Sequence, residues 1–241
     1  MKIAWITGTS RGLGKALAEL FLDADWYVNG MSRTHTMQHE AYTPHNIDLS
    51  DYKAVESFQF SIPESATTLL FIHNAGILGE IAPLGKLSPS ENIHAVYQVN
   101  LISAAQLCNA FLAAAGRNEP EKGIVLISSG AGRNPYDGWA PYCSSKAGLD
   151  MLARCITEEQ KRNNRNVKVF SVAPGVIDTE MQQEIRDASI ENFSYAERFR
   201  NLKIDNQLES PEACAKKLFR MWQYRQMFDD VCLDLRKLNL D

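Results

Sequence analysis

Tyr142 and Lys146 are the two residues whose types and spacing point most directly to chemistry. They stand four apart in the stretch PYDGWAPYCSSKAG, residues 135 to 148. If this stretch is helical, four residues make about one turn, so both side chains leave the same face of the helix. A tyrosine hydroxyl has a pKa of about 10, and a neighbouring ammonium lowers that pKa by favouring the phenolate. The pair is therefore either a proton donor beside the charge that tunes it, or a buried aromatic ring beside a solvated lysine.

A glycine-rich turn near the start of the chain offers a binding place for a nucleotide. The apolar run at residues 2–7 leads into TGTSRGLG, which has glycines at positions 8, 12 and 14, and helical spacing of apolar residues follows over residues 12–22. Glycines between a first strand and a first helix let the backbone approach a pyrophosphate, and the helix N-terminus presents N–H groups to it. Because glycines also serve ordinary tight turns, this signal is weak by itself.

Further apolar runs predict the strands of a parallel sheet. They lie at residues 26–31, 68–73, 123–127 and 167–172. Continuously apolar strands are what a sheet covered by helices on both faces requires. Their alternation with amphipathic stretches predicts an α/β fold, a Rossmann-type doubly wound parallel sheet that forms a single domain over residues 1–241.

Helix starts are recognisable between these runs. Ser50 can cap a helix beginning at Asp51, and residues 88–91 (SPSE) and 210–212 (SPE) combine a serine cap with a proline at the first helical position. Residues 176–209 are polar and too long for a simple connection, so we expect an insertion that covers the substrate.

Composition excludes several other classes of protein. The net charge of −4 comes with no basic block, which argues against a nucleic-acid partner. No apolar run reaches the roughly 18 residues of a membrane span, and the N-terminus is interrupted too early for a signal peptide. The five cysteines lack CxxC spacing and are typical of reduced cytoplasmic thiols. His35 and His39 stand four apart but have no third ligand at suitable spacing, so no metal is expected.

Seven sequence marks, in order over residues 3 to about 180, resemble the short-chain dehydrogenase/reductase family. After TGxxxGxG come Asp48-Leu49, Asn74-Ala75-Gly76, Asn100 in VNL, Ser129 in ISS, Tyr142-x-x-x-Lys146, and Pro174-Gly175 followed by Thr179. The resemblance implies an oxidoreductase with a nicotinamide cofactor. The cofactor site that it implies consists of Gly8, Ser10, Arg11, Gly12, Leu13, Gly14, Ser32, Arg33, Asp48, Leu49, Asn74, Ala75, Gly76, Tyr142, Lys146, Pro174, Gly175, Ile177 and Thr179.

Some members of this set also have a purely structural interpretation. By resemblance, Asp48 contacts the adenine, residues 74–76 shape the wall beside the adenosine, and Thr179 bonds the nicotinamide carboxamide. Asp48 is otherwise a turn residue and Thr179 a helix cap.

Two arginines favour NADP(H) over NAD(H). An NAD-selecting enzyme places an acidic residue at the end of the second strand, whereas this chain has Ser32-Arg33 there. The Arg33 guanidinium can bind a 2′-phosphate through two hydrogen bonds, and Arg11 lies on the same side. The alternative is a pair of solvated surface arginines, but charge complementarity favours the phosphate.

The resemblance also assigns catalytic roles. Ser129 precedes Tyr142 by 13 residues, as in the family, and Ser128 is the alternative. Tyr142 would protonate the developing alkoxide, Ser129 would donate a hydrogen bond to the carbonyl oxygen, and Lys146 would tune Tyr142 and hold the nicotinamide ribose. Asn100 would anchor a water that relays the proton, or else it is a buried amide that satisfies backbone groups.

Two longer runs resemble the branch of the family that contains sepiapterin reductases and bacterial benzil reductases. They are PYxGWxxYC and PGxxDTxMQ, the latter at residues 174 to 182. This implies an NADPH-dependent carbonyl reductase that acts on a vicinal dicarbonyl, either a sepiapterin-like pterin or a benzil-like diketone. The candidate substrate residues are Ser129, Trp139, Tyr142, Met181 and Asp234.

These substrate residues have alternative interpretations as well. Trp139 and Met181, with Tyr136, offer a flat apolar wall for an aryl or pterin ring, or else they pack a lid. Asp234 aligns with an acid that anchors the pterin in sepiapterin reductases, although an aspartate that ends a strand is common.

Other functions remain open within this fold. A 3-oxoacyl or other ketone reductase is the alternative enzyme, and an NADP-sensing regulatory protein is the alternative outside catalysis. Regulatory members usually lose the tyrosine or the lysine, and this chain keeps both. The stretches at residues 93–116 and 142–162 carry apolar residues on more than one face, which predicts a homodimer by resemblance.

Overall fold

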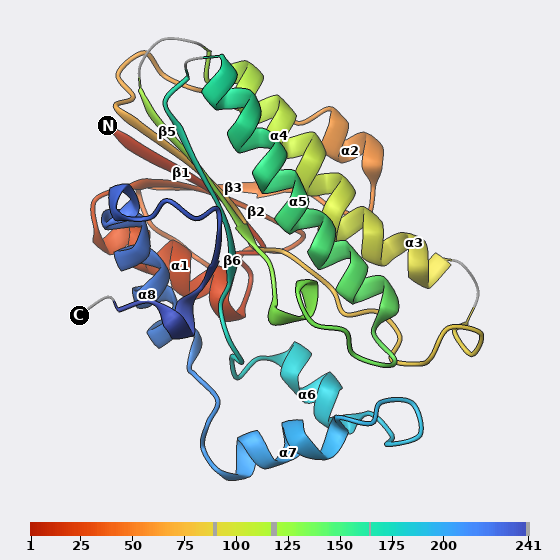
Figure 1. The fold of residues 1–241 in the computed structure, drawn as a ribbon. Coiled ribbons are helices and arrows are strands. Elements are labelled where there is room, and N and C mark those ends of the chain that lie inside the picture. Colours follow the sequence, from red (N-terminus) through yellow and green to blue (C-terminus); the bar gives the residue numbers. More distant parts are fainter. Residues whose placement is uncertain (89–90, 117–119, 164, 240–241) are drawn as a thin grey trace.

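A seven-stranded parallel sheet forms the centre of the computed structural model (Figure 1), which describes residues 1–88, 91–116, 120–163 and 165–239. The strand order is β3-β2-β1-β4-β5-β6-β7, and every neighbouring pair is parallel. The strands are β1 Lys2–Thr7, β2 Tyr27–Ser32, β3 Tyr42–Asn46, β4 Thr68–His73, β5 Glu121–Ile127, β6 Val167–Ala173 and β7 Cys232–Asp234. This confirms the Rossmann-type single domain predicted from the alternation of apolar runs.

Helices cover both faces of the sheet (Figure 1). One face carries α1 Gly12–Asp23 and α8 Pro211–Gln223, and the other carries α2 Tyr52–Glu56, α4 Ser103–Ala114 and α5 Ala140–Arg162. The helix α3 Glu91–Tyr97 runs into α4 through a π-helical turn, Gln98–Ile102. Beyond the carboxyl ends of the strands lie α6 Glu180–Asp187 and α7 Ala196–Ile204.

Each face of the sheet has its own apolar layer. Trp5, Phe71 and Phe111 are fully buried on the α4/α5 side, and Phe21 and Trp222 are buried on the α1/α8 side. Apart from the first residue or two of each strand, β1, β4, β5 and β6 are buried without interruption, which is the pattern that their apolar sequences predicted. The packed layers hold the carboxyl ends of these strands rigidly in place.

Several local expectations need correction. Asp51, rather than Ser50, caps α2: its Oδ1 accepts hydrogen bonds from the backbone N–H groups of Lys53 and Ala54. Ser50 instead donates to Asp48 Oδ1 over 2.7 Å. The serine cap of α8 at Ser210 is confirmed, whereas two residues of the expected cap at 88–91, residues 89 and 90, lie outside the described part of the chain.

The expected long helix at residues 93–116 is interrupted. The π turn at Gln98–Ile102 separates α3 from α4, and α4 ends at Ala114. The polar segment 176–209 is partly helical, because it contains α6 and α7.

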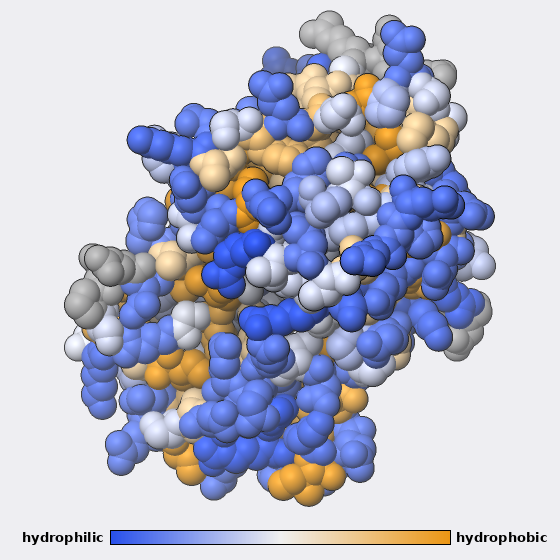
Figure 2. All heavy atoms as spheres, turned by 180° about the vertical axis from the view of Figure 1, so that it is seen from behind, coloured by the Kyte–Doolittle hydropathy of each residue, from blue (hydrophilic) through white to orange (hydrophobic). Residues whose placement is uncertain are grey.

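The surface seen from behind is mostly hydrophilic, with apolar residues in separate patches (Figure 2). Among the helices that the structure describes, none combines the length and the apolarity needed to cross a bilayer.

Candidate functional site

One cleft of about 1860 Å³ joins the glycine-rich turn to Tyr142 and Lys146. It opens at the carboxyl ends of the strands, where ligands of open α/β sheets bind. Only β4 lies between β1, which leads into the glycine turn, and β5, which ends at the serine pair. The sheet order therefore brings residues that are more than a hundred positions apart into one site.

Almost every residue predicted for the site lines this cleft. Three predicted residues do not: Gly14, Asn100 and Asp234. Gly14 and Asn100 support the wall from behind, and Asp234 is bound to a neighbouring arginine, as described below.

Glycines hold the turn that would take a dinucleotide pyrophosphate, and Gly8 and Gly12 line the cleft. Gly8 and Gly12 have φ values of +75° and +55°, in the left-handed region that favours glycine. A Cβ at Gly14 would lie 2.1 Å from the Gly8 carbonyl oxygen and 2.4 Å from Asn74 Nδ2. Asn74 in turn donates from Nδ2 to the Thr7 carbonyl over 3.0 Å. The turn is thus held in a shape that leaves the N-terminus of α1 open to an anion.

At the adenosine end, Arg33 lines the cleft beside Asp48. Hydrogen bonds from Ser50, first from its backbone N–H, hold the Asp48 pKa below its usual value, and Arg33 contributes to the same shift. Arg11 is exposed and pairs with Glu180 at the start of α6. Of the two arginines expected to select the cofactor, Arg33 therefore lies beside Asp48, whereas Arg11 ties the glycine turn to the helical insertion.

Tyr142 and Lys146 are both almost completely buried. Burial raises the pKa of Tyr142 to about 12, against a smaller opposite effect of the hydrogen bond with Ser129. Burial lowers the pKa of Lys146 to about 8. Lys146 Nζ donates to the Ile127 carbonyl over 2.8 Å and lies 5.8 Å from the centroid of the Tyr142 ring. The Tyr142 pKa is therefore raised in the protein alone, not lowered as expected from the nearby Lys146.

The two serines at the end of β5 have different environments. The Ser128 hydroxyl is buried and donates to the Lys146 carbonyl over 3.2 Å. Ser129 Oγ accepts from the Ala131 N–H over 3.1 Å and forms a hydrogen bond with Tyr142. Because its oxygen already accepts from Ala131, the Ser129 hydroxyl can direct its proton toward a ligand or Tyr142. This supports the choice of Ser129 over Ser128.

Asn100 occupies the π turn and is fully buried. Its Nδ2 donates to the Ile77 carbonyl and to Ser145 Oγ, over 2.9 and 3.0 Å, and its Oδ1 accepts from the Ile77 N–H over 2.8 Å. The side chain therefore satisfies backbone groups and joins the loop after β4 to α5. The water relay expected from the resemblance stays a prediction.

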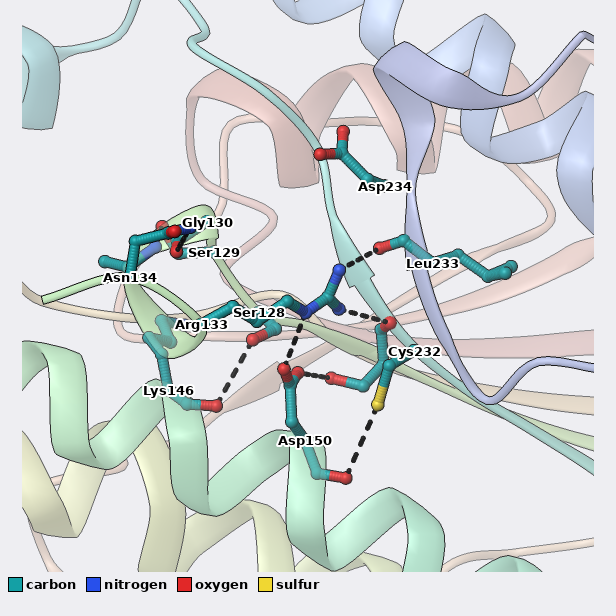
Figure 3. A network of polar contacts seen from close by, with 12 residues as sticks. Ser128, Ser129, Gly130, Arg133, Asn134, Lys146, Asp150, Cys232, Leu233 and Asp234 are labelled. Atoms are coloured by element: carbon teal, nitrogen blue, oxygen red, sulfur yellow. Dashed lines mark hydrogen bonds and ion pairs between the residues drawn. The ribbon is translucent and has the colours of Figure 1, made fainter.

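An ion pair between the partly exposed Arg133 and the nearly buried Asp150 fixes the serine turn against α5 (Figure 3). Arg133 Nε donates to Asp150 Oδ2 over 2.8 Å, and its other nitrogens donate to the carbonyls of Leu233 and Ser171. Ser171 Oγ donates to Asp150 Oδ1 over 2.6 Å. Asp150 stands one turn beyond Lys146 on α5, and its charge raises the Lys146 pKa against the effect of burial. One network thus connects the loop after Ser129, the helix of Lys146 and the last two strands.

Aromatic side chains form the wall beside Tyr142. Trp139 is buried, stacks on Phe193 at 4.5 Å with the ring planes 15° apart, and meets the Tyr142 ring edge-on at 5.7 Å. Tyr136 and Met181 line the same part of the cleft. These residues are therefore both packed under the helical insertion and exposed to the cleft, so the two interpretations of the aromatic wall are compatible.

Arg236 is a cleft residue that the sequence did not indicate. It follows β7 in a short 3-10 turn and donates from Nε and Nη2 to the two carboxylate oxygens of Asp234, over 2.9 and 2.6 Å. Arg236 lines the cleft and Asp234 does not. The Arg236 side chain lies close to Gly130 and Gly175, which are distant in the chain. Nothing in the local sequence of the C-terminal strand therefore indicates that Arg236 lines the cleft.

Comparisons with known proteins agree with this geometry. The model of the short chain dehydrogenase family matches residues 2–190. The chain is 39% identical over 228 residues to benzil reductase ((S)-benzoin forming) of Bacillus subtilis (strain 168), covering 92% of this chain and 93% of that protein. It is 35% identical over 167 residues to the sepiapterin reductase of Meriones unguiculatus, covering 67% of this chain and 60% of that protein. The crystal structure of the YIR035C short chain dehydrogenase/reductase from Saccharomyces cerevisiae has a TM-score of 0.82 at 24% identity, over 100% of this chain and 98% of that one.

The tight packing behind the glycine turn generates one prediction. Gly14→Ala would drive a Cβ into the Gly8 carbonyl and so distort the turn, and we expect the Kd for NADPH, measured by its fluorescence, to rise at least about tenfold. Gly130→Ala is the matched control in the same cleft, because its Cβ would meet nothing closer than 3.9 Å. Equal affinities for NADPH in the two variants would contradict this account of the turn.

The Asp150 charge generates a second prediction, on pH dependence. Asp150→Asn removes the charge that raises the Lys146 pKa, so Lys146 should lose its proton at lower pH. We expect the fall of kcat for ketone reduction at high pH to occur roughly one pH unit lower in the variant than in the wild type. Cys232→Ala is the control, because Cys232 contacts only the Asp150 carbonyl in this network and its loss leaves the carboxylate in place. An unchanged pH profile in a stably folded Asp150→Asn variant would refute the electrostatic link.

Proposed function

The chain belongs to the short chain dehydrogenase family and is an oxidoreductase, and from this premise we propose that it is an NADPH-dependent carbonyl reductase that acts on one ketone of a vicinal dicarbonyl. One observation carries the proposal. A single cleft holds the glycine turn with Arg33 at one end, and Ser129, Tyr142 and Lys146 beside an aromatic wall at the other.

The bound cofactor would supply a hydride to the carbonyl carbon. Tyr142 donates the proton that the carbonyl oxygen takes up, since a tyrosine hydroxyl is protonated at neutral pH and burial raises its pKa further. Ser129 donates a hydrogen bond to the same oxygen and stabilises the negative charge as it develops. Lys146, fixed by the Ile127 carbonyl, provides a positive charge below the Tyr142 ring and a donor for the nicotinamide ribose.

Arg33 supports NADPH as the cofactor. Arg33 follows β2 directly and lines the cleft, so its guanidinium can bind a 2′-phosphate where an NAD-selecting enzyme would have an acidic residue. The hydroxyl of Ser32 donates to the Thr34 carbonyl over 2.8 Å, which shapes the loop that carries Arg33.

The aromatic wall supports an aryl-substituted substrate. Tyr136, Trp139 and Phe199 line the cleft next to Tyr142 and together offer flat apolar surface. The benzil reductase and sepiapterin reductase relatives carry names consistent with a carbonyl flanked by a planar group.

The proposal extends to assembly and location. Ile102 and Met151 are exposed apolar residues on the side of the sheet that α4 and α5 cover. Such residues suit a helix-to-helix contact between two copies, and we propose a cytoplasmic homodimer.

Tyr142→Phe tests the proton donor. The variant loses the hydroxyl but keeps the ring, so we expect kcat for 1-phenylpropane-1,2-dione to fall at least about 100-fold in an assay that follows NADPH absorbance. NADPH binding should be retained. A variant that stays fully active would overturn the catalytic assignment.

Arg33→Ala tests the choice of cofactor. Loss of the charged contact should lower kcat/KM for NADPH roughly 10- to 100-fold and leave kcat/KM for NADH unchanged. Lys161→Ala, which removes an exposed cation from the far end of α5, is the control. Equal losses with both cofactors would mean that Arg33 does not select the phosphate.

A further inference from the structure

Arg236 lies in the part of the cleft where the reacting carbonyl must bind. The Arg236 side chain lies close to two backbone segments. A Cβ atom added at Gly130 would lie 3.9 Å from Arg236 Nη2, and one added at Gly175 would lie 3.4 Å from Arg236 Cγ and Cδ. Gly130 directly follows Ser129 in the chain. The guanidinium is therefore next to the turn that carries the hydroxyl assigned to the substrate oxygen.

The strand order also places Arg236 away from the nucleotide end. The glycine turn follows β1, Ser129 follows β5, and Arg236 follows β7 at the edge of the sheet. A ligand group that contacts Arg236 thus lies on the opposite side of Ser129 from the adenosine. Tyr136 of the aromatic wall is close enough to interact electrostatically with Arg236.

Asp234 orients this guanidinium and neutralises it. The carboxylate accepts from Arg236 Nε and Nη2 and from the Arg236 backbone N–H, over 2.9, 2.6 and 3.1 Å. Two of the five N–H donors of the guanidinium are used in this way, and the described residues take no others. Figure 3 shows the Asp234 carboxylate directed away from the Arg133 guanidinium, although its charge contributes to the raised pKa of Arg133.

We propose that Arg236 donates a hydrogen bond to the second, non-reacting oxygen of a neutral vicinal diketone and so determines the substrate class of this reductase. The inference rests on the proposed function, because it concerns the same reaction. Ser129 and Tyr142 hold the oxygen of the carbonyl group that is reduced, and Arg236, beside the Ser129 turn, keeps donors free for the adjacent oxygen. The reaction turns one C=O into CH–OH with a hydride from NADPH and a proton from Tyr142, while the second C=O stays unchanged.

The neutrality of the pair explains why a ketone suits this subsite. An unpaired guanidinium would favour a carboxylate, whereas the charge here is balanced by Asp234 and what remains is a set of oriented N–H donors. Asp234 itself has little capacity left to accept from a donor on the substrate. Asp234 therefore leaves little acceptor capacity for the amino edge of a pterin, whereas the free donors of Arg236 suit a second carbonyl oxygen.

The test compares two substrates that differ in the second oxygen. Wild type and the variants Arg236→Leu and Arg236→Lys are assayed with NADPH on 1-phenylpropane-1,2-dione and on 4-(trifluoromethyl)acetophenone, an activated monoketone. We expect Arg236→Leu to lower kcat/KM for the dione roughly 10- to 100-fold and to leave the monoketone unchanged, since only the dione loses a charge-assisted hydrogen bond. Arg236→Lys should recover part of the loss. Lys237→Leu, which removes a charge from the same turn but not from the cleft, should behave as wild type.

Each result decides the assignment. Equal losses on both ketones, or no loss on either, would show that Arg236 does not recognise the second oxygen. If Arg236→Leu also lowers the affinity for NADPH or the thermal stability, Arg236 has a structural role and does not recognise the substrate. If the wild type reduces the monoketone but no dione, both this inference and the proposed function are wrong. If the wild type reduces the dione and Arg236→Leu keeps the wild-type ratio of kcat/KM for the two ketones, only the inference is wrong.

Discussion

Desolvation of the Tyr142–Lys146 pair is the constraint on which the rest of the structure depends. Burial moves the two pKa values in opposite directions, to about 12 for the tyrosine and about 8 for the lysine. Both shifts favour the neutral side chain. A tyrosine is protonated at neutral pH even without burial, and the raised pKa extends that state to higher pH, so Tyr142 can give its proton to a carbonyl oxygen. Two neighbouring groups oppose these shifts. The Asp150 charge raises the Lys146 pKa, and the hydrogen bond with Ser129 lowers the Tyr142 pKa.

The surrounding elements are arranged to hold this pair in a dry and rigid place. Asn100 joins the loop after β4 to α5, and the Arg133–Asp150 pair joins the serine turn to α5, β6 and β7. Removing Arg133 from this pair would be costly because it would leave the nearly buried Asp150 carboxylate without its partner. On the far side of β4, the packing of Gly14 against Gly8 fixes the turn that faces a pyrophosphate. The same parallel sheet thus sets the distance between the place that binds the nucleotide and the place that performs the proton transfer.

The sequence predicted the fold and most of the cleft because those features have local signatures. Continuous apolar runs identified β1, β4, β5 and β6, and the spacing of Tyr142 and Lys146 placed both on one helix. The polar edge strand β3 has no such run, since only one of its five residues is buried. The spacing to Tyr142 already favoured Ser129 over Ser128, and the different hydrogen bonds of the two side chains support that choice.

Arg236 shows the limit of sequence reasoning more clearly. Its position in the cleft results from β7 lying beside β6 and from contacts with Gly130 and Gly175, which are distant in the chain. The aspartate two residues earlier was the visible candidate, and only the three-dimensional arrangement shows that its carboxylate is already engaged. The central claim, that burial leaves Tyr142 as the proton carrier, is tested most directly by 13C NMR of protein with tyrosines labelled at Cζ, the Tyr142 signal being assigned by its loss in Tyr142→Phe. The account predicts that this signal stays at its neutral position through pH 10 and titrates near 12. A Tyr142 signal that titrates at or below about pH 8, where a phenolate would dominate near neutrality, would contradict it.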